Sequence, residues 1–341
     1  MSTVVDDGLG RRLQDGAPEE VYDAISQELS RTYRPYMDIE LLPRGYETEL
    51  GSSFFVKKGH RLAIPKSRLV QAFAVARRIL LASHLDEPGR TCASDVRRAT
   101  SVMLLLDSEH LTAANARKRL LGQTRPANER ETQLKREMYF VNSLLSSHLH
   151  RHAKSPILWA HKHWLLRQYA EARIPMDLRH DFESVIHVAA ERHPKNYYAW
   201  TYARDLFASR AKVHARCWDA QQDEDLVQMT AGWCRRHHDD ISGWSFLLRL
   251  ALESPRHAHD MFRQTATLVR TYSWRGESVW NFLRNLVLVP ALRDDSEIEH
   301  SFVDLWQHVR QDVQHVQALD AKVLDRAADW VGIPSCQRNT S

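Results

Sequence analysis

The repeat that decides the fold is clearest in His193-Pro194-Lys195-Asn196-Tyr197-Tyr198-Ala199-Trp200-Thr201-Tyr202-Ala203-Arg204. It consists of a polar turn, a small or apolar residue, a tryptophan, and then an apolar run at helical spacing with basic residues among it. The pattern returns around four tryptophans that are separated by 41, 44 and 36 residues: Trp159, Trp200, Trp244 and Trp280. Periods in this range are typical of stacked pairs of helices, so the sequence indicates a helical-repeat protein.

The composition favours the same class. Of the 341 residues, 43% are hydrophobic and 26% are charged, as in folded globular proteins, and only 12 glycines and 12 prolines argue against disorder or a turn-rich β fold. The 47 basic and 43 acidic residues give a net charge of +4, far from the clustered charge of a dedicated nucleic-acid binder. We therefore expect an all-α protein without a nucleic-acid partner.

Cysteines and terminal segments indicate the compartment. Cys92, Cys217, Cys234 and Cys336 form no CxxC pair, so we expect reduced thiols and neither a disulfide framework nor a metal site. Cys336 does not lie in a terminal prenylation box. The N-terminus lacks a signal-peptide pattern, and no apolar run approaches the roughly 18 residues that span a bilayer. We expect a cytoplasmic protein without a transmembrane segment.

The domain prediction has three parts: a loose N-terminal segment and irregular cap over 1–64, an α-α superhelix (solenoid) of helical-hairpin repeats over 65–331, and a disordered tail over 332–341. The cap should contain a helix near 18–33 and extended chain near 53–56. Short turns join the later helices into antiparallel pairs. We place these pairs at 91–107 with 111–121, 128–150 with 156–171, 177–192 with 196–212, 220–237 with 241–252, 256–273 with 277–289, and 295–312 with 316–330.

The tryptophans have a structural explanation. A large ring at the same place in each second helix fills the space between successive hairpins and buries about 150–250 Å². We therefore expect all four to pack in the core. The basic residues one turn further on, Lys162, Arg204 and Arg284, are expected to be solvated or to cap helix ends.

Residues 195–200 resemble the repeat signature of protein prenyltransferase α subunits, approximately Lys-Asn-Tyr-x-x-Trp-x-x-Arg. Residues 154–166 look like a second copy with Lys162 in the arginine place, and 277–283 resemble a late repeat. Residues 111–118 resemble the first repeat, with Arg117 in the arginine place. The likeness covers roughly 38–290 and is greatest to the α-subunit repeat-containing members, the α-type partners of a type-3 geranylgeranyltransferase.

The resemblance implies an accessory subunit of a heterodimer with a prenyltransferase β subunit. In this family the β subunit holds the zinc and the prenyl chain, so the chain itself would need no cofactor. The reaction would move a geranylgeranyl group from its diphosphate to a cysteine of a protein acceptor. The resemblance makes Lys195 the catalytic, diphosphate-contacting residue, with Tyr197 beside it and Lys154 in the corresponding place one repeat earlier.

The position of Lys195 also has a physical argument. Asn196 is a candidate N-cap, so Lys195 would lie beside the positive end of the following helix, which favours an anion. The alternative for Lys195, as for Lys154, is an ordinary solvent-exposed turn lysine.

The repeats depart from the family three residues after the tryptophan, where Ala203 and Leu247 replace arginine, whereas the leucine at 283 is normal for the family's last repeat. We expect these changes to alter contacts with the partner. The other interpretation of the whole chain is a non-enzymatic, tetratricopeptide-like scaffold for protein–protein interaction. Tetratricopeptide units recur at about 34 residues, whereas these tryptophans recur at 36–44.

Clusters of other polar residues have simpler explanations than a metal site. Among the histidines at 148, 150, 152, 161 and 163, only His148 and His152 share a helix face, which favours surface and packing roles. The acidic residues around Asp219 suit the first turn of a helix, and Asp240 suits an N-cap.

Overall fold

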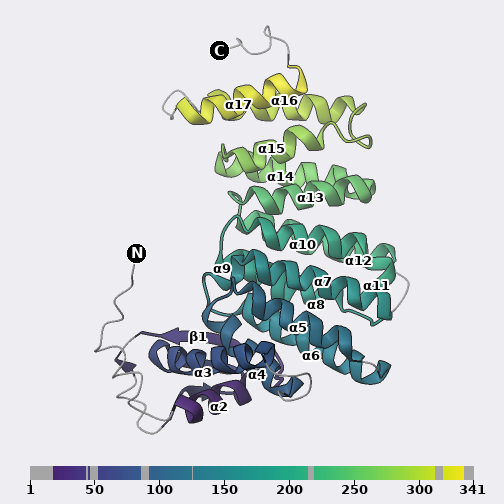
Figure 1. Ribbon diagram of the computed structural model, residues 1–341. Coiled ribbons are helices and arrows are strands. Elements are labelled where there is room, and N and C mark those ends of the chain that lie inside the picture. The colour runs from purple at the N-terminus through teal and green to yellow at the C-terminus, as the bar shows by residue number, and fades with distance from the viewer. Residues whose placement is uncertain are drawn as a thin grey trace. The chain divides into compact units, whose positions relative to one another are not determined.

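The computed structural model describes residues 18–43, 45–46, 53–85, 92–124, 126–213, 219–311 and 318–333. The predicted N-terminal segment before residue 18, the predicted tail beyond residue 333, and two of the cysteines, Cys217 and Cys336, lie outside the described residues. The chain divides into two compact units, residues 1–215 and 216–341. Each unit is described by itself, with the element labels of Figure 1.

The first unit begins with a helix and a small sheet. The elements are α2 (Pro18–Glu28), β1 (Asp38–Leu42), β2 (Val56–Lys58) and β3 (Arg61–Pro65). The strand order is β1-β3-β2, with β1 parallel and β2 antiparallel to β3. Leu62 and Ile64 of β3 are buried on either side of the partly exposed Ala63, so one face of the sheet joins the core. The region expected to be an irregular cap therefore contains an ordered three-stranded sheet.

The rest of the first unit is helical. Its elements are α3 (Lys66–Leu85), α4 (Ala93–Leu106), α5 (Leu111–Gln123), α6 (Ala127–Ser146), η2 (His152–Lys154), α7 (Pro156–Ala172), α8 (Leu178–Asp181), the π-helical η3 (Phe182–Ile186), α9 (His187–Arg192), α10 (Tyr197–Ala208) and α11 (Arg210–Val213). The helix predicted over 177–192 is one helical run interrupted by a π-helical segment. Helices α5, α7 and α10, the second members of successive hairpins, pack in a row.

The described part of the second unit contains three further hairpins. Its elements are α12 (Ala220–Arg236), α13 (Ile241–Glu253), η4 (Pro255–His257), α14 (Ala258–Tyr272), α15 (Glu277–Leu286), α16 (Ser296–Gln311) and α17 (Ala318–Val331). The second helices α13, α15 and α17 pack in a row, and α14 packs against α16. Hairpins stacked in two layers are the arrangement of α-α repeat proteins, so the all-α helical-repeat fold class is confirmed.

The indole rings of three repeat tryptophans, Trp159, Trp244 and Trp280, tie their helices to the turn before them. Trp159 donates from Nε1 to the Ala153 carbonyl at 2.8 Å, and Trp280 donates to the Trp274 carbonyl at 2.9 Å. Trp244 makes the same bond, six residues back. All four repeat tryptophans are at most 1% exposed. One side chain thus fills the core and also satisfies a turn carbonyl.

Helix caps define where the second helices begin. Ser155, four residues before Trp159, accepts a hydrogen bond from the N3 backbone N–H of α7, and Asp240 does the same for α13. Asp219 forms a capping box with Gln222 at the start of α12. The predicted helix starts at Asp219 and Asp240 are therefore confirmed.

Candidate functional site

The turn that carries Lys195 is held in place by a buried asparagine. Lys195 adopts left-handed backbone geometry with φ of 58°, and the side chain of Asn196 then caps α10 by accepting a hydrogen bond from the Ala199 N–H. The side-chain amide of Asn196 donates to the Ala153 carbonyl at 2.7 Å and to the Ala189 carbonyl at 3.2 Å. Asn196 therefore fastens its own turn to the turn of the preceding repeat.

This bond brings two of the predicted lysines to neighbouring turns. Lys154 directly follows Ala153, whose carbonyl accepts the hydrogen bond from Asn196. Both Lys154 and Lys195 are exposed. The rings of His150 and His193, on the same two turns, lie 4.9 Å apart. Two exposed lysines therefore lie on adjoining turns of the first unit.

An exposed aromatic side chain completes this lysine edge, which we define as Lys154, Lys195 and Tyr197. Tyr197 is the first residue of α10 and is 62% exposed. Its ring contacts Tyr198 at a centroid distance of 5.9 Å. Cations and a hydroxyl beside the first turn of a helix form an arrangement that can receive a phosphate group. The three residues predicted to contact diphosphate thus lie on adjacent turns.

Lys162 has a different environment from the one expected. Its side chain is fully buried, and its ammonium nitrogen lies 2.7 Å from Asp181 Oδ1 and 2.5 Å from Asn142 Oδ1. The Tyr202 ring centroid lies 4.6 Å from the same nitrogen. Burial lowers the pKa of Lys162, and Asp181 opposes that effect. The expectation that Lys162 is solvated or caps a helix end is wrong, because three helices supply partners for it inside the core.

Arg117 is the equivalent residue one repeat earlier and is also buried. Its guanidinium makes two hydrogen bonds to Glu137, at 2.8 and 2.7 Å. Although burial opposes ionisation, the charge and hydrogen bonds of Arg117 lower the pKa of Glu137. His161 lies 3.3 Å from Glu137, and burial lowers its pKa to about 4. His161 is therefore neutral at pH 7, and the Arg117–Glu137 pair carries the charge of this cluster.

The later repeats also bury the residue that stands where Arg117 and Lys162 stand in the first two. Ala203, Leu247 and Leu283 are each at most 1% exposed. A side chain three residues after the repeat tryptophan thus points into the core in every repeat. The expectation that these substitutions alter contacts with a partner is corrected, because a residue here packs inside the chain.

The sequence analysis did not identify the polar partners of the buried cations, which are Glu137, Asp181 and Asn142. Each lies in a helix among buried apolar neighbours, as Glu137 does between Leu134 and Val141. A carboxylate on the apolar face of a helix is unfavourable unless it is paired. A carboxylate on an apolar helix face was therefore the signal in the sequence that a cation is buried beside it.

The histidines make separate contacts. His148 bonds to Asp38 at 2.9 Å, and His152 contacts the Leu104 carbonyl at 3.0 Å. His163 lies 2.9 Å from Asp205. No group of three histidine, cysteine or acidic side chains with metal-binding geometry occurs in the described ranges. No helix in those ranges is long and apolar enough to cross a membrane.

Comparisons with known proteins agree with the repeat architecture. Residues 158–272 match a family described as the ECM9 middle domain. A protein of Danio rerio named protein prenyltransferase alpha subunit repeat-containing protein 1 is 28% identical over 167 residues, which cover 43% of this chain. The match spans 35% of the length of that relative. The chain is therefore similar to a prenyltransferase α-subunit repeat protein over part of its length.

Proposed function

We propose that this chain is the α-type subunit of a cytoplasmic, heterodimeric protein prenyltransferase. With a β subunit it would transfer a geranylgeranyl group from its diphosphate to a cysteine of a protein acceptor. The observation that carries the proposal is the lysine edge, in which the Asn196–Ala153 bond fixes the turns of Lys195 and Lys154 side by side. The partial similarity to a repeat-containing prenyltransferase α-subunit protein supports it.

The proposed chemistry assigns an electrostatic task to this edge. In the transfer, the bond between the isoprenoid carbon and the diphosphate oxygen breaks while the cysteine sulfur forms a bond to that carbon. Negative charge then builds on the departing diphosphate, and a positioned cation stabilises it. Lys195 supplies that cation, Tyr197 donates a hydrogen bond, and Lys154 adds positive charge from the neighbouring turn. Zinc, which the proposal places in the β subunit, would lower the pKa of the acceptor thiol.

The internal cations sharpen this assignment. Arg117 and Lys162 are buried and paired with Glu137 and Asp181, so neither can reach a ligand of a partner subunit. Among the basic residues of the repeat signature, the turn lysines are the ones that face solvent. The proposal therefore rests on Lys195 and Lys154 and excludes the buried positions from chemistry.

The test is co-expression of the full chain with a prenyltransferase β subunit, followed by purification and a prenyl-transfer assay with a protein acceptor. We expect a 1:1 complex. Lys195→Ala should lower turnover about tenfold or more, which corresponds to about 1.4 kcal/mol of transition-state stabilisation. Lys154→Ala should have a smaller effect. The matched control is Lys212→Ala, which removes another exposed lysine of the same unit.

The outcomes separate the two candidate roles. Failure to recover any β subunit with the chain would refute the proposal and favour the tetratricopeptide-like scaffold. Wild-type turnover by Lys195→Ala in an intact complex would reduce this chain to a support for the β subunit. A loss in Lys212→Ala as large as in Lys195→Ala would show that net charge, rather than the lysine edge, matters.

A further inference from the structure

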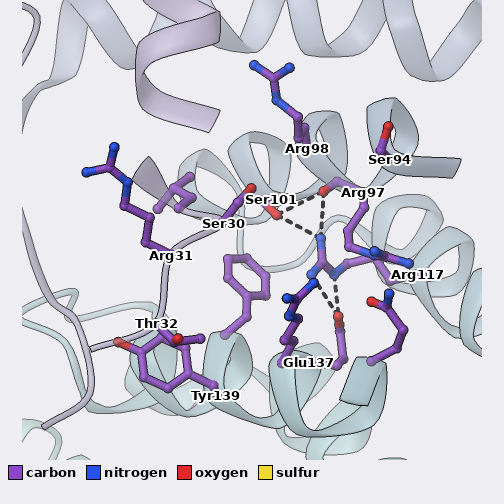
Figure 2. A pocket seen from close by; sticks show the side chains of 14 residues that line it. Ser30, Arg31, Thr32, Ser94, Arg97, Arg98, Ser101, Arg117, Glu137 and Tyr139 are labelled. Carbon is purple, nitrogen blue, oxygen red and sulfur yellow. Dashed lines mark hydrogen bonds and ion pairs between the residues drawn. The ribbon is translucent and has the colours of Figure 1, made fainter. Parts of the chain in front are cut away.

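A pocket of the first unit carries an excess of positive charge. It lies between the end of α2 and helices α4, α5 and α6, and its volume is about 270 Å³, which has room for several water-sized groups. The charged residues among its described lining are five arginines and one carboxylate: Arg31, Arg97, Arg98, Arg117, Arg136 and Glu137. Figure 2 shows the Arg117–Glu137 pair on one wall, with Arg31 and Arg98 extending away from it.

The carboxylate does not neutralise the pocket, because Arg117 already occupies it through two hydrogen bonds. Arg31 and Arg98 have acidic neighbours outside the pocket lining, Glu28 at 3.0 Å and Asp23 at 2.7 Å. Asp23 and Arg31 are exposed and Arg98 is partly exposed, and ion pairs with an exposed partner are weak in water. The acidic neighbours therefore leave the pocket positive.

Two arginines of the pocket have no ion pair with any residue in the described part of the chain. These are Arg97 on α4 and Arg136 on α6. Arg97 is partly buried, and its pKa is lowered by burial and then by the positive charges of Arg117 and Arg136, against the attraction of Glu137 and Glu129. Like charges held together in a partly desolvated place disfavour the folded chain unless an anion joins them.

Neutral hydrogen-bond donors surround the same space. Thr32, Ser94 and Tyr139 line it, and Ser94 lies in the first turn of the 14-residue helix α4. The Tyr139 hydroxyl accepts a hydrogen bond from the Tyr33 N–H at 2.9 Å, so its own hydrogen can be donated elsewhere. Guanidinium groups and hydroxyls around one cavity match the oxygens of phosphate groups.

We propose that this pocket binds a small anion that carries two or more phosphate groups. Apart from Arg117, whose guanidinium is already bonded to Glu137, the arginines come from three segments of the chain, so one phosphate could not satisfy them all. The described lining contains only two apolar side chains, Leu29 and Phe140, and so offers little surface to an isoprenoid chain. The site is separate from the lysine edge, since neither Lys195 nor Lys154 lines it. The inference holds whether or not the chain belongs to a prenyltransferase.

The test is calorimetric titration of the full chain with inorganic phosphate, inorganic pyrophosphate and inositol hexakisphosphate, with citrate as a carboxylate comparison. We expect affinity to rise with the number of phosphates and to exceed that for citrate. Arg97→Gln and Arg136→Gln should each weaken inositol hexakisphosphate binding about tenfold or more, because each removes a charge-assisted partner. Arg119→Gln removes an exposed arginine of α5 outside the pocket lining and should bind as wild type does.

Thermal unfolding supplies an independent readout. Inositol hexakisphosphate should raise the unfolding temperature of wild type and of Arg119→Gln but not of the pocket variants. Three results would overturn the proposal: no binding of any phosphate probe, citrate binding as tight as pyrophosphate binding, or equal losses in Arg119→Gln and Arg136→Gln. The last comparison does not involve the partly buried Arg97, because both of its changes are made at exposed arginines.

Discussion

The buried Lys162–Asp181 pair allows the repeat energetics to be tested directly. Lys162 is fully buried, Asp181 is 3% exposed, and their charged atoms lie 2.7 Å apart. The change Lys162→Met keeps the volume but leaves the Asp181 carboxylate and the Asn142 amide oxygen without this donor. Removing one partner of a buried ion pair costs about 3–5 kcal/mol. That loss is a large fraction of the roughly 5–15 kcal/mol that stabilises a typical protein.

A double variant separates the loss of the ion-pair attraction from the cost of leaving the Asp181 carboxylate buried without a partner. Lys162→Met with Asp181→Leu removes both charges, and apolar replacement of a buried pair is often neutral or stabilising. The second unit already has apolar residues in place of a buried cation, because Leu247 and Leu283 occupy the repeat position of Lys162 and are buried. We therefore expect the double variant to recover most of the stability lost in the single variant.

The assay is urea unfolding followed by circular dichroism, with hydrogen exchange of the α6 and α7 amides as a local readout. The control is Lys135→Met, because Lys135 pairs with Glu131 on the surface of α6, where an i,i+4 pair contributes only about 0.3–0.5 kcal/mol. The reasoning is refuted if the free energy of unfolding of Lys162→Met lies within about 1 kcal/mol of that of Lys135→Met, since the loss expected for an orphaned buried charge would then be absent. It also fails if the double variant is no more stable than the single one.

Three further changes test other contacts. His161 has a pKa of about 4 in the folded chain, whereas the unfolded ring titrates near 6.5. The free energy of unfolding should therefore fall by up to about 3 kcal/mol as the pH drops from 6.5 to 4. Urea titrations at several pH values should show a flatter pH profile for His161→Gln. Asn196→Ala should cost about 1–2 kcal/mol in unfolding experiments, because the cap of α10 and the bond to Ala153 are both lost. Trp244→Phe should lower the unfolding temperature, because it removes the bond to the His238 carbonyl and leaves a small void; an unchanged temperature would contradict the role of the indole N–H.

The repeat architecture could be predicted because its signals are local. The tryptophan period indicated stacked hairpins, and acidic residues such as Asp240 marked helix starts. The small sheet was harder, since β2 has only three residues and all of them are exposed. Strands of this length depend on pairing with β3 rather than on their own pattern. The π-helical segment after Asp181 likewise has no signature of its own in the sequence.

The candidate site was predictable only in part. The motif singled out Lys195, but its proximity to the Lys154 turn depends on a hydrogen bond between residues 43 positions apart. The phosphate pocket could not be found in this way at all, because its arginines come from separate helices and follow no shared motif. The charge of a cavity depends on which carboxylates pair with which cations, and only the tertiary structure reveals that pairing.

The ionic pairs of the first unit give its lysine edge a fixed position. Lys162 on α7 is satisfied only where Asn142 on α6 and Asp181 at the end of α8 meet it, so one side chain sets the register of three helical segments. Asp181 lies within the helical run that starts with α8 and leads through η3 and α9 to the turn of Lys195. A leucine at position 162 would pack in several registers, whereas the ion pair has one satisfied geometry. We infer that the buried Lys162–Asp181 pair is kept in this core because it positions the turn of Lys195.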